Sequence, residues 1–305
     1  MHFETDQQNL GRLARYIDPR VLNRTKAKRV ILGLAVLFLL VGVAISLDRN
    51  PQVLNNLNWR PVLLLVLVAV PVTVMLSAYE FVLTGRLVGR QIAMSAAIEI
   101  SILGTAANLL PLPGATLVRV AALKAAGAGY GEGTKATLLV AGLWAGVAFL
   151  FAGSWMVRLG VGPISVLFVV VGFIAWLACF AYGVWRCQGA TLPVSLSLAK
   201  VALVTVDALR MFLCLNALGV AIVFDQAAAL AVAGVVGNAV SIVPAGLGIR
   251  EAVSAGLAPL VGLGAGMAFL AAALNRLLGL ITVVPLAIGM LLSGRGKAAG
   301  SNTVA

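Results

Sequence analysis

Two short segments combine proline, glycine and arginine in a way that could bind an anion. They are residues 108–119 and 238–251. In each, an asparagine (Asn108 or Asn238) precedes a proline by five or six residues, and an arginine (Arg119 or Arg250) follows that proline by six. A guanidinium group can bind phosphate or carboxylate through two parallel hydrogen bonds. The residue types therefore point to recognition of an anionic group.

In the second segment the break in the helix should place the arginine at a helix start. We expect a new helix to begin near Leu247, with Arg250 in its first turn. A cation is disfavoured at the positive end of a helix dipole unless an anion shares the site. Glu251 or a lipid phosphate could be that anion. The alternative is that Arg250 and Glu251 only pair with each other and with neighbouring helices. The hinge residues predicted for the two breaks are Pro113, Gly114, Pro244, Gly246 and Gly248.

Other polar side chains also interrupt apolar sequence. An ionised group at the bilayer centre costs about 2.5–3.5 kcal/mol on insertion scales, so each is a candidate for function. Asp207 and Arg210 share a helical face, and mutual neutralisation is the favoured interpretation. Glu80 is expected near the membrane interface, and Glu99 could pair with Arg119 or Arg250. The predicted binding set is Asn108, Arg119, Asn238, Arg250, Glu251, Glu99 and Asp207.

The composition predicts how these residues are positioned. Hydrophobic residues make up 61% of the chain, charged residues 10%, and the mean hydropathy is +1.06. These values indicate an all-α protein that crosses the membrane several times. The net charge of +12 lies mostly in the N-terminal segment and short connections. It is therefore interpreted as a topology signal rather than a nucleic-acid surface.

Several kinds of chemistry find no support in the sequence. The single histidine is His2, and the three cysteines lack metal-binding spacing. A Walker A motif is absent, and the glycines of residues 127–133 have no preceding strand that would make them a dinucleotide motif. We expect no catalytic residue, metal ion or cofactor, and the protein is not expected to be an enzyme.

Six apolar stretches are long enough to cross roughly 30 Å of hydrocarbon. They are residues 29–47, 61–83, 134–157, 162–185, 196–218 and 264–292. A basic interfacial segment is predicted at 1–29, a single transmembrane domain at 30–292, and a disordered tail at 293–305.

Residues 92–124 and 226–260 are each predicted to form a re-entrant hairpin with a broken helix. This arrangement keeps most lysines and arginines on the side of the basic N-terminus, as the positive-inside tendency requires. Both termini are then cytoplasmic. The hairpins would enter from opposite faces, which is the pattern of an inverted repeat with halves of roughly 61–157 and 196–292.

The stretch 244–251 resembles a known family. It reads proline, small residue, glycine, hydrophobic, glycine, hydrophobic, arginine, glutamate, which is similar to the membrane region of lysylphosphatidylglycerol synthases. Ala245 stands where that family usually has glycine. The first-half motif is matched by Pro111, Pro113, Gly114 and Arg119, but Thr116 stands in the stretch where an acidic residue often occurs.

The resemblance implies a lipid translocase of the flippase type, and we expect it in the cell inner (plasma) membrane. The predicted binding set would then hold the headgroup of a phospholipid, which could be aminoacylated. The main alternative is a non-transporting membrane partner of a glycosyltransferase or lipid-modifying enzyme, and a second is a carrier of a small soluble anion. The expected partners are the bilayer, its phospholipids, and either a second copy of the chain or a separate lipid-synthesising enzyme. Lipid synthesis itself is not expected in this chain.

Overall fold

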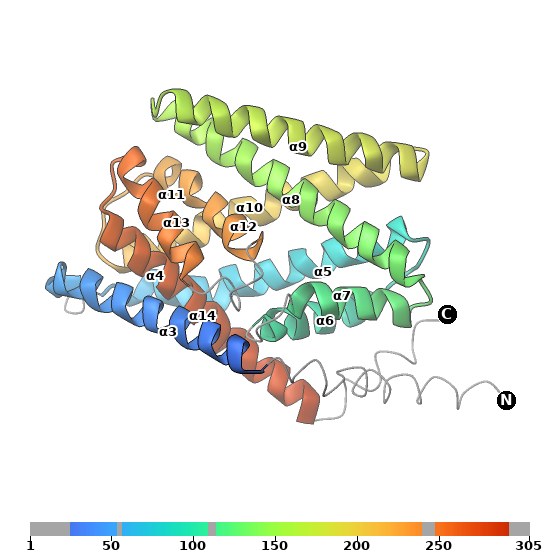
Figure 1. Cartoon of the computed structure of the whole chain (residues 1–305), viewed down its shortest axis with the longest axis horizontal. Coiled ribbons are helices and arrows are strands. Elements are labelled where there is room, and N and C mark those ends of the chain that lie inside the picture. Colours follow the sequence, from blue (N-terminus) through green and yellow to red (C-terminus); the bar gives the residue numbers. More distant parts are fainter. Residues whose placement is uncertain (1–24, 54–56, 109–113, 240–247, 293–305) are drawn as a thin grey trace.

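The computed structural model describes residues 25–53, 57–108, 114–239 and 248–292, and their regular structure is helical throughout (Figure 1). The predicted all-α class is therefore confirmed for this part of the chain. The tail at 293–305, most of the segment at 1–29, and hinge residues Pro113, Pro244 and Gly246 lie outside the described residues.

The predicted spans correspond to long helices. These are α3 (Thr25–Asp48), the continuous run α4 (Trp59–Leu64), η2 (Leu65–Ala69) and α5 (Val70–Leu87), then α8 (Tyr130–Arg158), α9 (Pro163–Cys187), α10 (Thr191–Ala217) and α14 (Ala265–Leu292). Four of them are long and apolar enough to cross a membrane: the α4–α5 run, α8, α9 and α14. The described part of the chain thus has the helices of a multi-pass membrane protein, and four of the six predicted spans coincide with these candidate spans. Helix α10 has the length, but it carries Lys200, Asp207 and Arg210.

Short helices occupy the two regions predicted as hairpins. The first region holds α6 (Met94–Ala107) and α7 (Gly114–Ala125), and the second holds α11 (Phe224–Leu230), α12 (Val232–Ala239), α13 (Ile249–Leu257) and the 3-10 turn η4 (Ala258–Val261). At 1.5 Å per residue, even the 14 residues of α6 extend only about 21 Å, which is too short to cross the hydrocarbon. Helix α6 packs on α7, and α12 packs on α13. The two groups lie toward opposite ends of the long axis (Figure 1).

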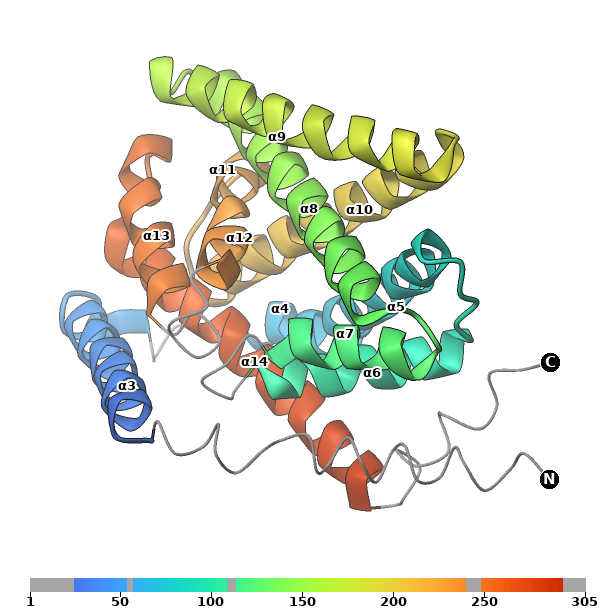
Figure 2. The ribbon, with the colours of Figure 1, turned by 45° about the vertical axis from the view of Figure 1, so that its right-hand side comes forward.

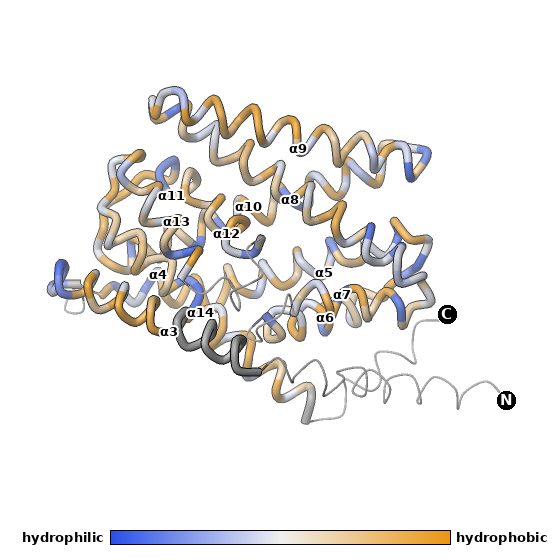
Figure 3. Tube along the Cα trace, viewed as in Figure 1, coloured by the Kyte–Doolittle hydropathy of each residue, from blue (hydrophilic) through white to orange (hydrophobic). Residues whose placement is uncertain are grey.

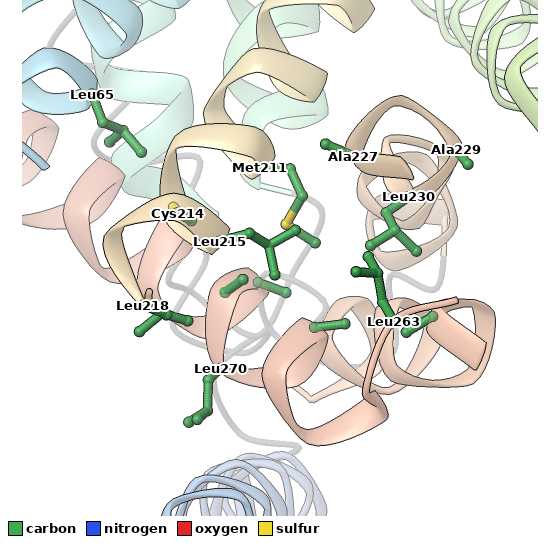
Figure 4. Packing of buried hydrophobic residues seen from close by; sticks show 14 of the residues in the cluster. Leu65, Met211, Cys214, Leu215, Leu218, Ala227, Ala229, Leu230, Leu263 and Leu270 are labelled. Atoms are coloured by element: carbon green, nitrogen blue, oxygen red, sulfur yellow. The ribbon is translucent and has the colours of Figure 1, made fainter. Parts of the chain in front are cut away.

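Helix α10 runs through the middle of the bundle. It packs against α4, α5, α8, α9, α11 and α14. Around its C-terminal half, Met211 and Leu215 lie with Leu230 of α11 and Leu263 in the largest apolar cluster (Figure 4). Polar side chains on α10 are consequently enclosed by protein on most sides.

Helices α8 and α9 form a close pair because glycines line their contact. A Cβ atom on Gly146 would lie 2.5 Å from the backbone nitrogen of Trp176, and one on Gly172 would lie 2.4 Å from that of Leu150. Small residues allow helix backbones to approach closely inside a membrane. The outer side of α9 is largely apolar, with its polar residues at the ends (Figure 3).

Polar contacts tie the connections together at each end of the bundle. Arg90 donates to the carbonyl of Gly127, and Arg186 pairs with Glu132 at 3.0 Å. At the other end, Arg158 pairs with Asp225 at 3.2 Å. The end with the α5–α6, α7–α8 and α9–α10 connections therefore collects several basic residues.

We predict that Gly146→Ala destabilises the protein, because the added methyl group meets backbone rather than a flexible side chain. Overpacking of this kind costs about 1–3 kcal/mol. The measurement is thermal unfolding of the purified protein in detergent.

Gly256→Ala is the matched control, since a Cβ on this helical glycine meets nothing within 4 Å. It should leave the unfolding temperature unchanged or raise it slightly, because alanine is the better helix former. Equal effects of the two variants would contradict the close α8–α9 contact.

Candidate functional site

Three charged residues of α10 organise two buried polar clusters. Lys200, Asp207 and Arg210 lie at spacings of seven and three residues, so they project toward neighbouring faces of one helix. Lys200 and Arg210 are separated by about 15 Å along the helix axis. The central position of α10 buries both, with only 4% of Lys200 exposed.

The first cluster, called here the Glu80 cluster, consists of Glu80, Arg119 and Lys200. Arg119 Nη1 lies 2.7 Å from Glu80 Oε1, and Lys200 Nζ lies 2.7 Å from Glu80 Oε2. Two aromatic rings support the cations: Lys200 Nζ is 5.6 Å from the ring centre of Trp144, and Arg119 Cζ is 5.9 Å from that of Phe81. One carboxylate thus holds two cations from two other helices.

Glu80 was expected near the membrane interface, and in the structure it is enclosed by protein, with only 1% of it exposed. Helix α5 continues to Leu87, and it is covered by α6 and α10 at the level of Glu80. Lys200 was not among the site residues predicted from the sequence. An isolated lysine within the apolar stretch 196–218 was a signal that could have identified it.

The second cluster, called here the Arg250 cluster, consists of Asp207, Arg210, Arg250, Glu251 and Arg276. Glu251 Oε1 pairs with Arg276 Nη1 at 3.2 Å, and Asp207 Oδ1 pairs with Arg210 Nη1 at 3.8 Å. Helix α13, which carries Arg250, packs on α14, which carries Arg276, and α14 packs on α10. Three guanidinium groups and two carboxylates therefore lie on three helices that pack together.

Arg250 is the member of this cluster without a carboxylate partner in the described part of the chain. It is the second residue of α13, in the first turn as predicted. Its guanidinium lies against Gly234 of α12, where a Cβ would be 3.6 Å from Arg250 Cζ. Glu251 pairs with Arg276 instead. Of the structural alternative, the described residues therefore show the pairing of Glu251 with a neighbouring helix but no ion pair between Arg250 and Glu251.

Several fully buried polar atoms beside this cluster lack hydrogen bonds within the described residues. They are both carboxylate oxygens of Glu251, the hydroxyl of Ser254, and both side-chain amide atoms of Asn275. The charged groups of Glu251 and Arg276 are therefore close enough to form an ion pair, but their atoms are not aligned for a hydrogen bond. Buried polar groups are ordinarily satisfied by protein or water. These atoms could thus still form hydrogen bonds, and they lie beside a cluster that has one more cation than it has anions.

Arg210 reaches this region from the opposite side. Its Nη2 lies 3.4 Å from the carbonyl oxygen of Asn275, and its Nη1 lies 3.4 Å from the hydroxyl of Thr73 on α5. A Cβ on Gly279 would be 3.0 Å from Arg210 Nη2, so the missing side chain lets the guanidinium approach α14. Ser254 and Gly279 were not predicted from the sequence as site residues.

The remaining predicted site residues lie apart from these contacts. Asn108 caps α7, because its side-chain oxygen accepts a hydrogen bond from the N–H of Ala115 at 2.9 Å. Asn238 is exposed near the end of α12. Glu99 is partly buried on α6, and no ion pair joins it to Arg119 or Arg250 among the described residues. The structure thus unites Arg250, Glu251 and Asp207 in one cluster and places Arg119 in the other. It brings no group of three or more His, Cys, Asp or Glu side chains together within the described ranges.

Comparison with known families bears on the second cluster. Residues 187–289 match the family described as Lysylphosphatidylglycerol synthase TM region. This match confirms the family resemblance indicated by the sequence motifs. It covers about a third of the chain, from the end of α9 into α14, and it contains the whole Arg250 cluster. No curated protein matches the chain.

We predict that Glu80→Gln destabilises the fold strongly, because it leaves Arg119 and Lys200 buried without a counter-charge. Removing one partner of a buried ion pair costs about 3–5 kcal/mol. Thermal unfolding in detergent measures the loss.

The control is Glu132→Gln, which breaks the exposed pair with Arg186. Exposed pairs contribute about 0–1 kcal/mol, so this variant should unfold close to the unmodified protein. A Glu80 variant as stable as the Glu132 variant would show that the Glu80 cluster does not hold the helices together.

Proposed function

We propose that the chain is a membrane lipid translocase that moves a phospholipid headgroup between leaflets through its polar interior. The observation that carries the proposal is Arg250, a half-buried guanidinium that lacks a paired carboxylate within the described residues. Each of the other three arginines in the two clusters has one. A buried charge without a partner is costly. A phosphate bound there would remove that cost and would match the geometry of the guanidinium.

Hydrogen-bonding groups next to Arg250 suit the remainder of a polar headgroup. The carboxylate of Glu251, the hydroxyl of Ser254 and the amide of Asn275 can accept or donate hydrogen bonds there. The acyl chains would remain in the hydrocarbon while the headgroup crosses. Asn108, Asn238 and Glu99 remain proposed contacts along the route rather than members of either cluster.

The spacing of the two clusters supports movement between two positions. Arg119 and Lys200 mark one position, and Arg250 marks the other. Since Lys200 and Arg210 lie about 15 Å apart on α10, the clusters are separated by roughly half the hydrocarbon thickness. Short helices flank each predicted break at opposite ends of the bundle, as an inverted repeat with alternating access requires (Figure 1).

Orientation in the membrane follows from the basic residues. The end that carries Arg86, Arg90, Lys135 and Arg186 would face the cytoplasm, together with both termini. We place the protein in the inner membrane, where anionic lipids attract such a surface. The sequence contains no nucleotide-binding motif, so transport would be downhill or coupled to an ion gradient.

Arg250→Gln should slow lipid transport at least about tenfold, because a charged hydrogen bond to phosphate contributes roughly 1.5–3 kcal/mol. The measurement reconstitutes purified protein into liposomes with a fluorescent phospholipid. Dithionite then quenches the lipid that reaches the outer leaflet. Thermal unfolding establishes that the variant is folded.

Arg158→Gln is the matched control, since Arg158 is an exposed arginine at the end of α8, with its Asp225 pair on the surface. It should transport lipid at the unmodified rate. Normal transport by the Arg250 variant would overturn the proposed site. If the unmodified protein moves no lipid, the non-transporting partner of a lipid-modifying enzyme is favoured instead.

A further inference from the structure

An open apolar groove lies between α8, α9 and α10, and none of the residues of the two polar clusters lines it. Its volume is about 590 Å³, within the range of 300–1,000 Å³ typical of ligand pockets. The lining comprises Val147, Leu150, Phe151, Ser154, Trp155, Phe173, Trp176, Phe180, Val194, Ser197, Leu198 and Val201. Five of these twelve residues are aromatic, against 7% of the whole chain.

The groove follows from the way the three helices pack. The glycine contacts hold α9 close to α8, while α10 diverges from α9 after their short connection at 188–190 (Figures 1 and 2). The wedge between α9 and α10 is thereby left open, with α8 as its floor. The groove extends about 10 Å along α10, from Val194 to Val201.

The walls of the groove are fixed by specific contacts. The Trp176 indole N–H donates a hydrogen bond to the Ser197 hydroxyl at 3.2 Å, which joins α9 to α10. Trp176 also stacks on Phe180, with 5.0 Å between ring centres, and Phe151 meets Trp155 edge-on at 6.0 Å. Aromatic pairs in these geometries add rigidity beyond simple burial.

The chemistry of the lining selects an apolar occupant. Charged side chains are absent from it. Its two hydroxyls are already engaged, because Ser154 donates to the carbonyl of Leu150 at 2.7 Å and Ser197 accepts from Trp176. Both α8 and α9 are long, apolar candidate membrane spans, and an apolar groove between such helices suits a hydrocarbon occupant.

We infer that this groove binds one hydrocarbon chain of a membrane lipid. The chain lies along the wedge between α9 and α10, against the aromatic rings. The inference is independent of transport, since a bound lipid chain would serve equally to fasten α9 to the rest of the bundle. It concerns a site that contains none of the residues of the two polar clusters.

The test uses a phospholipid with a photoactivatable diazirine in its acyl chain, mixed into vesicles that hold the full-length protein. After irradiation, mass spectrometry maps the labelled residues. Lining residues of α9 and α10 should be labelled in preference to Leu167 and Ile174, which are exposed on α9 outside the groove. Uniform labelling of all exposed apolar residues would overturn the inference.

Val201→Phe should lower labelling of the lining residues about tenfold. The larger side chain would displace roughly two methylene groups of the bound lipid chain from the groove, and the loss of their burial gives about this ratio. Val194→Phe tests the same effect from the other end of the groove, should the first variant fold poorly. The control is Val170→Phe, because Val170 is 47% exposed on α9 outside the groove and Val201 is 43% exposed within it. If the lining residues were labelled equally in the folded groove variants and in the Val170→Phe control, the inference would be contradicted.

Discussion

The cost of placing charge inside a membrane protein constrains this structure more than any other interaction. Two carboxylates from different helices, Glu80 and Glu251, are almost completely buried. Each is held by cations from other elements: Arg119 and Lys200 in one case, Arg276 in the other. These pairs fix how α5, α7, α10, α13 and α14 meet, because separating them would leave ions unpaired in a low-dielectric interior.

Helix α10 links the two clusters since it carries charged residues for both. A helix with Lys200, Asp207 and Arg210 would be unfavourable if it faced lipid. Because α10 is enclosed by α5, α8, α11 and α14, these three residues lie in the interior of the bundle instead. Their spacing along one helix also separates the two clusters by about 15 Å along the axis of α10.

Glycines determine how closely several of the apolar helices pack. The contacts at Gly146 and Gly172 hold α8 and α9 together, and Gly234 and Gly237 let Arg250 lie against α12. Because α9 packs closely on α8 and diverges from α10, an apolar groove remains between α9 and α10. None of the residues that line the groove belongs to either polar cluster, so the charged side chains and the apolar groove are separate features of α10.

The sequence by itself determined the all-helical class, the positions of the long helices, the short helices beside both breaks, and the place of Arg250 in the first turn of α13. These features depend on local hydropathy and on proline and glycine, which act within a few residues. Only the tertiary structure decided which ions meet. Glu80 and Lys200 are 120 positions apart and pair because α5 and α10 pack side by side. Asn108 became a helix cap because α7 begins close to it, and the groove exists because α9 diverges from α10. Such contacts depend on how helices pack in three dimensions, and the spacing of residues along one chain does not encode them directly.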